Sequence, residues 1–461
     1  MSFTTEASRW PDVWLAATAR GTTICGDFLA ATALALALQG AGAGGLAVSG
    51  LLLAATLPLV VLAPLTGRLV DRVDSRALLV TVGLAQAVIC TLLAVAEHPI
   101  VVVSLVALLA CGLAVTQPCL AALLPAMVRP ADLPRASAIS QNAVSLGALG
   151  GPVLAGLLVG QFGTRVPLLL DAATYLALVV AGLLLRTRRG GRRPAAVVAG
   201  QAGGSSPDRT ADPRGTNLGW RLRRDPLMLV MVTSTAVVIA AIGGINVIEV
   251  FFIRETLHGS ATTYGLVGAA WMAGMLPGSW LAARLARRFD DDAALIRGVL
   301  VSLAVCSLLV LFAAGVPTAG VLVPLWLVAG AANGGENVFA NLLTSRRVPE
   351  AMRGRAYASY GAAVQGGSMA GYLIGGALLT AVPPRPLIAG AGVAGLLVVL
   401  VFVPVVARAV RRPSSGEADG RHRGAGLATS GRPAEPAREA GDTVGSWLSA
   451  SHARGSGTSS S

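Results

Sequence analysis

The sequence predicts an all-α integral membrane protein with twelve transmembrane helices in two groups of six. Apolar residues make up 54% of the 461 residues and charged residues only 13%, whereas soluble domains carry about 25% charged residues. The apolar residues gather in twelve runs, each near the roughly 20 residues that a helix needs to cross a bilayer. A long polar stretch after the sixth run divides the twelve into six and six.

Each run is expected to be a helix, because backbone groups in lipid must be hydrogen-bonded within their own segment. The predicted spans of the first group are 13–38, 46–67, 77–96, 99–122, 136–160 and 166–185. Those of the second group are 227–253, 264–283, 295–315, 317–343, 355–381 and 385–409.

Three polar segments flank these two membrane halves, which span 13–185 and 227–409. Residues 1–12 form a short N-terminal segment, whose charges and long following apolar run are not those of a cleavable signal peptide. The linker 186–226 carries ten arginines and the stretch GQAGGSSPDRT, and the tail 410–461 is rich in Gly, Ser, Arg and Pro. These compositions predict disorder in the linker and the tail.

The distribution of arginine predicts the orientation. Without the linker, twelve arginines lie in the connectors on the side of the N-terminus, and only Arg165, Arg254 and Arg385 lie in those on the other side. The positive-inside rule therefore places the N-terminus, the linker and the C-terminus in the cytoplasm. The bias toward Arg, Ala and Gly is typical of a GC-rich bacterium, so we expect a multi-pass protein of the bacterial plasma membrane.

Composition also excludes several kinds of chemistry. All 36 basic residues other than histidine are arginine, which excludes a phosphate-binding-loop ATPase and a Schiff-base enzyme, because both need lysine. The five cysteines lie within apolar runs and the four histidines are scattered, so we expect no metal site, no cofactor and no enzymatic activity. The arginines are not interleaved with aromatic residues, so we expect contact with anionic lipid and no nucleic-acid partner.

The loop after the second span reads GRLVDRVDSR. This loop resembles the signature loop of the major facilitator superfamily, and the matching residues are Gly67, Leu69, Asp71, Arg72 and Arg76. Asp74 stands where that family has a second glycine, a departure associated with its drug- and siderophore-exporter branch. Gly67 allows two helices to approach, and Asp71 can cap a helix and pair with arginine, which makes this loop a candidate conformational switch. The alternative is an ordinary cytoplasmic turn with mixed charges.

The fifth span contains GALGGPVLAG. This segment resembles the antiporter signature of the exporter branches, with Gly147, Gly151, Pro152 and Gly156 matching and Ala155 in place of one glycine. Small residues allow helices to pack closely, and proline interrupts the backbone hydrogen bonds where a helix can bend. The alternative is the small-residue packing common to many membrane helices.

Three further segments carry the same resemblance: GDFL (26–29), LLPAMVRPADLPRASAIS (123–140) and RRVPEAMRGRAYA (346–358). The resemblance implies two pseudo-symmetric six-helix halves that rock around a central cavity lined by spans one, four, seven and ten. One departure concerns coupling. Many proton-coupled exporters carry an arginine within span four, where this chain has Gln117.

Ionisable residues deep in a span are candidates for function, because a central charge costs about 2.5–3.5 kcal/mol on insertion. Arg20, Thr23 and Asp27 share one face of span one, and the resemblance places this face against the substrate path. We predict Asp27, Glu336 and Arg20 as candidates for proton or cation coupling. The alternatives are that Arg20 extends to the cytoplasmic surface and that Asp27 forms a buried structural pair or a cap.

Span ten carries Asn333, Asn337 and Asn341 at helical spacing beside Glu336. The stripe predicts a cargo site, and the alternative is an asparagine ladder that holds helices together. The cargo contacts predicted over the whole chain are Thr23, Gln117, Asn246, Asn333 and Asn337.

Three other features of the spans receive less weight. Glu249 is predicted to lie at the outer interface near Arg254, and Asp171 to be structural, near the start of span six. Trp271, Met272 and Met275 are expected to face lipid or the protein core more than a binding pocket.

These features together predict a monomeric secondary transporter that exports a lipophilic drug or natural product by proton antiport. Its partners are then a small lipophilic molecule, protons and the lipid bilayer. The alternatives are a siderophore exporter, an importer of the same fold, and a membrane scaffold or sensor that has lost transport.

Overall fold

The computed structural model describes residues 8–187, 222, 225–289 and 291–411. The rest of the chain, which includes residue 290 and most of the predicted linker and tail, lies outside the described residues. The described part is helical and contains no strand. Its helices form one compact unit that ends at Arg411.

The N-terminal half contains six long helices, as the sequence predicts. They are α1 (Trp10–Gly40), α2 (Gly44–Arg72), α3 (Ser75–Leu93), α4 (Pro99–Met127), α5 (Leu133–Phe162) and α6 (Arg165–Leu184), with the short 3-10 turn η1 (Pro130–Asp132) before α5.

The C-terminal half contains the other six predicted spans. The seventh is interrupted and consists of α7 (Pro226–Gly243), α8 (Ile245–Phe251) and the π-helical turn η3 (Phe252–Thr256). The remaining helices are α9 (Ala261–Ala286), α10 (Asp292–Ala313), α11 (Leu322–Arg347), α12 (Glu350–Leu378) and α13 (Pro384–Arg411), with the 3-10 turn η4 (Ala319–Val321) before α11.

Ten of the twelve spans within the described part are both long and apolar enough to cross a membrane, if α7, α8 and η3 are counted as one. The two others, α11 and α12, are long enough but less apolar, since they contain asparagine, glutamate, arginine and many glycines. Polar helices of this length are stable in a bilayer when their polar faces turn toward protein or a cavity.

Side-chain caps define where several helices begin. Asp74, Asp225, Ser260 and Asp291 each accept a hydrogen bond from a backbone N–H in the first turn of α3, α7, α9 and α10, over 2.7–3.2 Å. Such caps satisfy donors that have no partner within the helix. They matter at a membrane surface, where the helix ends leave the lipid.

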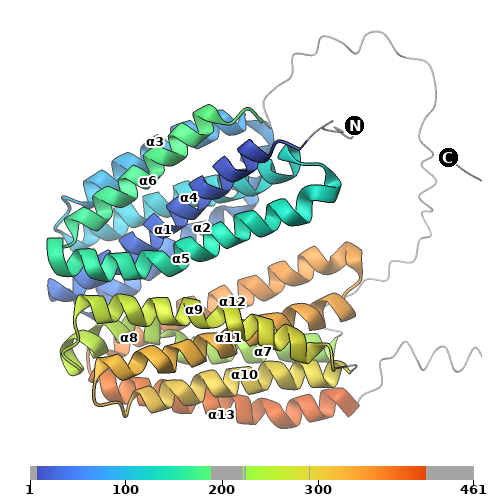
Figure 1. The fold of residues 1–461 in the computed structure, drawn as a ribbon. Helices are drawn as coiled ribbons and strands as arrows, with labels where there is room; N and C mark the ends of the chain where they lie inside the picture. Colours follow the sequence, from blue (N-terminus) through green and yellow to red (C-terminus); the bar gives the residue numbers. More distant parts are fainter. Residues whose placement is uncertain (1–7, 188–221, 223–224, 290, 412–461) are drawn as a thin grey trace, which may run out of the picture. The chain divides into compact units, whose positions relative to one another are not determined.

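The two halves repeat one packing pattern (Figure 1). In the N-terminal half, α1 packs on α5, α2 on α4 and α3 on α6. The equivalent pairs in the C-terminal half are α7 with α12, α9 with α11 and α10 with α13. The first span of each half thus packs on the fifth, the second on the fourth and the third on the sixth, which confirms the two pseudo-symmetric halves.

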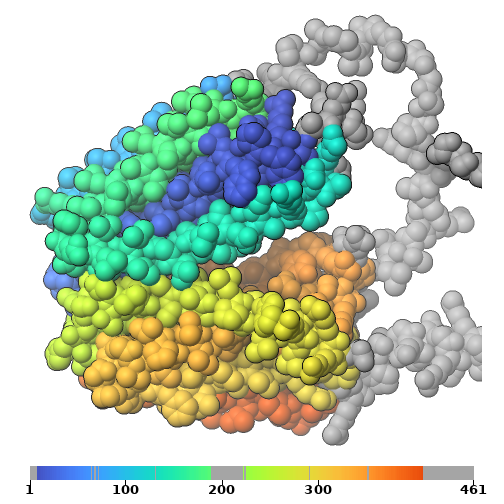
Figure 2. Space-filling model, viewed as in Figure 1, coloured from blue at the N-terminus to red at the C-terminus, as the bar shows by residue number. Residues whose placement is uncertain are grey.

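The halves meet through α5 with α9 and through α2 with α12. The contacts lie where α5 and α12 end and where α2 and α9 begin, and Ser49 donates a hydrogen bond to the Tyr372 carbonyl over 2.5 Å. Toward the opposite face, where α1, α5, α7 and α12 begin, the halves separate and leave a hollow between them (Figure 2). The structure is therefore closed at one face and open at the other.

A charged cluster ties three helix ends of the C-terminal half together at the open face. The Arg347 guanidinium, at the end of α11, donates through Nε to both carboxylate oxygens of Asp225 at 3.0 Å and through Nη1 to Asp292 at 3.0 Å. Asp225 also caps α7, and Asp292 lies in the first turn of α10. One arginine therefore holds α7, α10 and α11 in register.

We predict that Arg347→Ala lowers the free energy of unfolding by about 1–3 kcal/mol, because two partly buried carboxylates lose their partner. The matched control is Arg165→Ala, which removes an exposed 3.6 Å ion pair with Glu97 and should change stability by less than about 0.5 kcal/mol. Unfolding of both variants in a denaturing-detergent titration checks this, and equal losses would contradict the assigned role.

Candidate functional site

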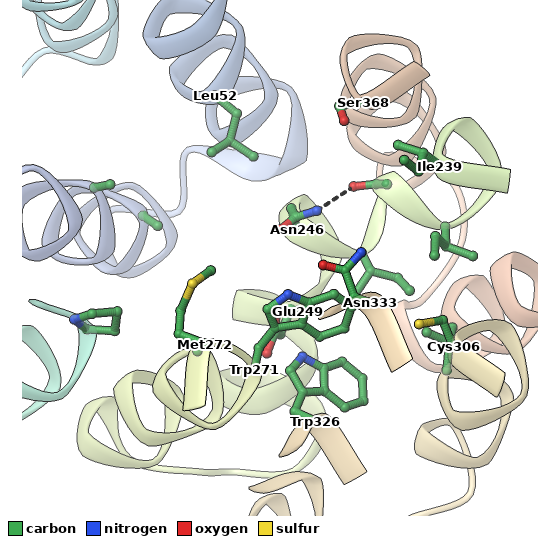
Figure 3. Close-up of a pocket in the computed structure, with 18 of the residues that line it drawn as sticks. Leu52, Ile239, Asn246, Glu249, Trp271, Met272, Cys306, Trp326, Asn333 and Ser368 are labelled. Atoms are coloured by element: carbon green, nitrogen blue, oxygen red, sulfur yellow. Dashed lines mark hydrogen bonds between the residues drawn. The ribbon is translucent and has the colours of Figure 1, made fainter. Parts of the chain in front are cut away.

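A cavity of about 390 Å³ lies between the two halves. Helices α1, α2 and α5 line it from the N-terminal half, and α7 to α12 line it from the C-terminal half. Its volume falls within the range of small-molecule sites, about 300–1,000 Å³. Most of the wall is apolar. Its polar or aromatic side chains, several of which are labelled in Figure 3, are Phe28, Thr32, Asn246, Glu249, Tyr264, Trp271, Trp326, Asn333, Glu336 and Ser368.

The break in the seventh span shapes one wall of this cavity. Helix α7 ends at Gly243, and α8 begins at Ile245. A Cβ on Gly244 would lie 3.0 Å from the Gly371 carbonyl oxygen and 3.1 Å from the Gly375 Cα of α12. Glycine therefore lets the broken span pack directly on α12, with Asn246 of α8 at the cavity wall.

Glu249 lies in the cavity wall and not at the outer interface, so that prediction is wrong. Its Oε1 atom is buried and accepts no hydrogen bond from the described residues. The Trp326 indole interacts with the carboxyl group, and Trp271, Trp326 and Glu249 gather at the same part of the cavity (Figure 3). Helices α9 and α11 supply these neighbours, and their placement beside α8 is not encoded in any local pattern.

Glu336 lies where α7, α11 and α12 meet and also lines the cavity. Its side chain is buried, with 3% exposed. Its Oε1 atom accepts hydrogen bonds from the Thr235 hydroxyl over 3.2 Å and the Tyr360 hydroxyl over 2.8 Å. Two hydroxyls on neighbouring helices thus fix this carboxyl group in place.

The asparagine stripe of span ten bonds to its own helix. Asn337 Nδ2 donates to the Asn333 carbonyl over 2.9 Å, and Asn341 Nδ2 donates to the Asn337 carbonyl over 2.7 Å. Asn246 Nδ2 likewise donates to the Gly243 carbonyl over 3.1 Å. Of the predicted cargo contacts, Asn246 and Asn333 line the cavity, and Asn337 is not among the lining residues.

Asp27 faces the interior of the N-terminal half. It accepts a 2.5 Å hydrogen bond from the Tyr175 hydroxyl of α6. Asp171, also on α6 and fully buried, accepts hydrogen bonds from the Cys90 thiol and the Thr174 hydroxyl, each over 3.2 Å. The structure therefore places two carboxyl groups in one buried cluster between α1, α3 and α6.

The close packing of α1 on α6 explains this pairing. A Cβ on Gly26 would overlap the Asp171 carboxyl and Thr174, so Asp171 lies against the backbone just before Asp27. Asp171 lies within α6 and does not cap it, and the N-cap residue Thr164 makes no side-chain cap either. Its depth, six residues into an apolar helix, is the signal in the sequence that marks it as unusual.

The other predicted residues of span one and span four lie outside this cluster and outside the cavity lining. Arg20 is half-buried, donates through Nη1 to Ser140 of α5 over 3.3 Å, and has a buried Nε without a partner among the described residues. Thr23 is buried and donates to the Arg20 carbonyl. Gln117 is half-buried on α4.

Two of the three large side chains singled out in the eighth span line the cavity. Trp271 and Met272 are part of its wall, which corrects the expectation that both face lipid or core, while Met275 is not among the lining residues. The cavity therefore offers an aromatic and a thioether surface from α9.

The signature-like loop joins α2 to α3. Gly67 lies within α2, the side chain of Asp71 lies outside the described residues, Arg72 ends α2 and is exposed, and Arg76 lies in the first turn of α3. The side chain that caps α3 is Asp74, whose Oδ1 accepts from the Arg76 N–H over 2.7 Å. The departure from the signature at Asp74 thus has a structural purpose.

The antiporter-like motif in α5 forms two close contacts. Added Cβ atoms at Gly147 and Gly151 would overlap the backbone of α1 between Gly21 and Leu29. A Cβ at Gly156 would lie 2.7 Å from the Ala261 carbonyl oxygen and 3.2 Å from the Gly265 Cα, both on α9 of the other half. The motif residue Pro152 lines the cavity. The motif therefore packs α5 within its own half and against the opposite one.

Comparison with known proteins identifies the family. The model of the transmembrane secretion effector family matches residues 7–419. The chain belongs to this family, and it is a membrane transporter of the major facilitator type. No curated protein sequence matches the chain significantly.

Several solved transporter structures share the fold of this family member. The nucleoside transporter NupG superposes with a TM-score of 0.69 at 14% identity, over 86% of this chain and 99% of that one. A bacterial homologue of the iron transporter ferroportin, in an inward-facing state, gives 0.64 at 16% identity, over 88% and 100%. A peptide transporter of the POT family in complex with sulfate gives 0.65 at 14% identity, over 89% and 96%.

We predict that Gly156→Ala weakens the contact between the halves, because the backbone of α9 must move away from the new methyl group. Spin labels at Gln39 and Glu255, which bond to each other across the halves over 3.1 Å, should show a longer distance distribution. Gly160→Ala is the matched control, since its Cβ would meet only the Thr262 hydroxyl at 3.5 Å. An unchanged distribution in Gly156→Ala would contradict this role.

Proposed function

We propose that this transporter exports a lipophilic organic compound, a drug or a natural product, across the bacterial plasma membrane by alternating access with proton antiport. The observation that best supports this is the cavity between the halves, which is largely apolar and has two carboxyl groups in its wall. In this proposal the protein acts as a monomer, and the open face with the helix ends near Arg347 is cytoplasmic, as the arginine distribution predicts.

The contacts between the halves support an alternating mechanism. At the closed face the halves meet through small residues such as Gly156, through few hydrogen bonds such as that of Ser49, and through apolar side chains of α8 that join the core of the N-terminal half. Few hydrogen bonds must therefore break when this interface separates, and one core of the C-terminal half lies wholly within that half. Rocking of the two halves then exposes the cavity to one face or the other.

Coupling is proposed to depend on buried carboxyl groups that exchange protons. Glu336 lines the cavity, so cargo and a proton there can influence each other's binding through one site. Asp27, paired with Asp171 inside the N-terminal half, is the second candidate, and Arg20 on the same helix is the third. Each proton that crosses 100 mV supplies about 2.3 kcal/mol, which is available to concentrate cargo outside.

Cargo contact is proposed for Asn246 and Asn333 in the cavity wall, with Thr23, Gln117 and Asn337 as candidates that another conformation would have to expose. The solved structures with this fold include transporters of nucleosides and peptides, so the fold leaves open a siderophore exporter or an importer. A transport-dead scaffold is disfavoured by the cavity and its carboxyl groups.

We expect everted membrane vesicles with an imposed proton gradient to accumulate some members of a panel of lipophilic dyes and antibiotics. Asp27→Asn and Glu336→Gln should each be tested, because loss of gradient-driven uptake identifies the carboxyl group that carries the proton. Glu97→Gln, an exposed carboxyl group on the surface, is the control and should transport normally.

The pattern of losses distinguishes the candidates. Uptake that survives in Asp27→Asn but is lost in Glu336→Gln would assign coupling to the cavity carboxyl group. Uptake that needs no gradient in any variant would refute proton antiport, and accumulation only in right-side-out vesicles would indicate import.

We expect Asp71→Asn to insert normally and to transport at least about tenfold more slowly, because the residue is proposed to stabilise one conformation of the halves. The measurement compares membrane expression and initial transport rates of Asp71→Asn and of the nearby Arg76→Gln with those of the wild type. Transport at the wild-type rate and equal expression would rule out the switch role of Asp71.

A further inference from the structure

We propose that the cavity binds an organic cation, a lipophilic amine or quaternary ion, with Glu249 as its charge partner. This inference rests on the proposed function, because it names the class of cargo for the same cavity. It assigns to Glu249 a role separate from that of Glu336.

The charges in the cavity wall support a cation. The lining residues include the carboxyl groups of Glu249 and Glu336 and contain no arginine or histidine, and the chain has no lysine. An anionic cargo would therefore meet two acceptor groups without a charged donor, and its transfer from water would be strongly disfavoured. A cation would instead meet two carboxyl groups that can balance its charge.

Hydrogen bonding distinguishes the two carboxyl groups. Glu336 Oε1 already accepts two hydroxyl hydrogen bonds, from Thr235 and Tyr360. The Glu249 carboxyl group interacts with the Trp326 indole, but its Oε1 atom is buried and receives no hydrogen bond from the residues that the structure describes. Buried polar atoms nearly always have a partner, so this oxygen is available to a ligand, from which an ammonium N–H would supply a charge-assisted bond and a quaternary ion a close charge contact.

The aromatic residues next to Glu249 fit the same ligand. Trp271, Trp326 and Tyr264 line the cavity together with Glu249, and Figure 3 shows both indoles beside it. Cations bind over the faces of such rings, with tryptophan the strongest partner. The remaining wall is apolar, with Phe28 and Met272 among its residues, which favours a lipophilic body on the charged group.

An inorganic cation fits this wall poorly. Hard metal ions need about six or more oxygen ligands, and the described residues contain no cluster of three or more acidic, histidine or cysteine side chains able to hold a metal ion. The aromatic and aliphatic surface gives such an ion no replacement for its water shell. The geometry therefore favours an organic cation over Na⁺, K⁺ or a divalent metal.

The test compares two ions of nearly the same size and opposite charge, tetraphenylphosphonium and tetraphenylborate. Binding of each to the purified full-length protein in detergent is measured by equilibrium dialysis, without a gradient or transport. We expect tetraphenylphosphonium to bind at least about tenfold more tightly than tetraphenylborate. Glu249→Gln should weaken binding of the cation by about tenfold or more, because the negative charge is lost, and leave binding of the anion unchanged or improved.

Two further variants complete the design. Glu97→Gln, on the exposed surface, is the matched control and should bind like the wild type. Glu249→Asp should retain much of the preference for the cation, since it keeps the charge. If Glu249→Gln does not fold, the comparison of the two ions on the wild-type protein and on Glu249→Asp still decides the question.

The inference is overturned if tetraphenylborate binds as tightly as tetraphenylphosphonium, if neither ion binds, or if Glu249→Gln binds the cation like the wild type. Failure of the proposed function has a different signature. Charge-selective binding that depends on Glu249, with no gradient-driven flux in vesicles, would support the cation site and refute proton-coupled export. Gradient-driven flux of neutral compounds without cation binding would support proton-coupled export and refute the cation site.

Discussion

Polar groups within the membrane have no water to bond with, and the rest of this structure depends on that constraint. Backbone groups satisfy it by forming helices, and helix ends satisfy it with caps such as Asp74 and Asp225. Buried carboxyl groups satisfy it by recruiting hydroxyls and a thiol from neighbouring helices, as Glu336 and Asp171 do. Glu249 differs from these, because its carboxyl group interacts with the Trp326 indole while its buried Oε1 atom accepts no hydrogen bond from the described residues.

Close packing through glycine is the second requirement, and it serves both rigidity and movement. Within each half, glycines bring helices into backbone contact, as Gly147 does between α5 and α1. Between the halves, Gly156 and Gly265 make the contact of α5 with α9 without long interlocking side chains. An interface of this kind packs closely in one state and needs few bonds to be broken before it separates. The ion cluster around Arg347 instead lies within one half, where a fixed arrangement is useful.

Much of the fold was predictable because hydrophobic length and basic-residue distribution are local properties. The twelve spans, the division into halves and the glycine-rich motif in α5 all follow from residues read in order along the chain. The break at Gly243 and Gly244 was not predicted, because two glycines in an apolar run do not reveal whether a neighbouring helix will approach them. The pairing of Asp27 with Asp171 was also missed, since 144 residues separate two carboxyl groups that only the packing of α1 on α6 brings together.

The sequence by itself determined that this chain is a helical membrane protein with two six-helix halves, and it singled out Asp27 and Glu336 as ionisable residues deep within their spans. Only the tertiary structure decided which side chains share the cavity, that Glu249 and Trp271 belong to its wall, and that Asp27 faces the interior of its own half. The physical reason is that insertion energy depends on each helix separately, whereas a binding site depends on which faces of different helices meet. That second property arises from packing between distant segments and leaves little trace in any one of them.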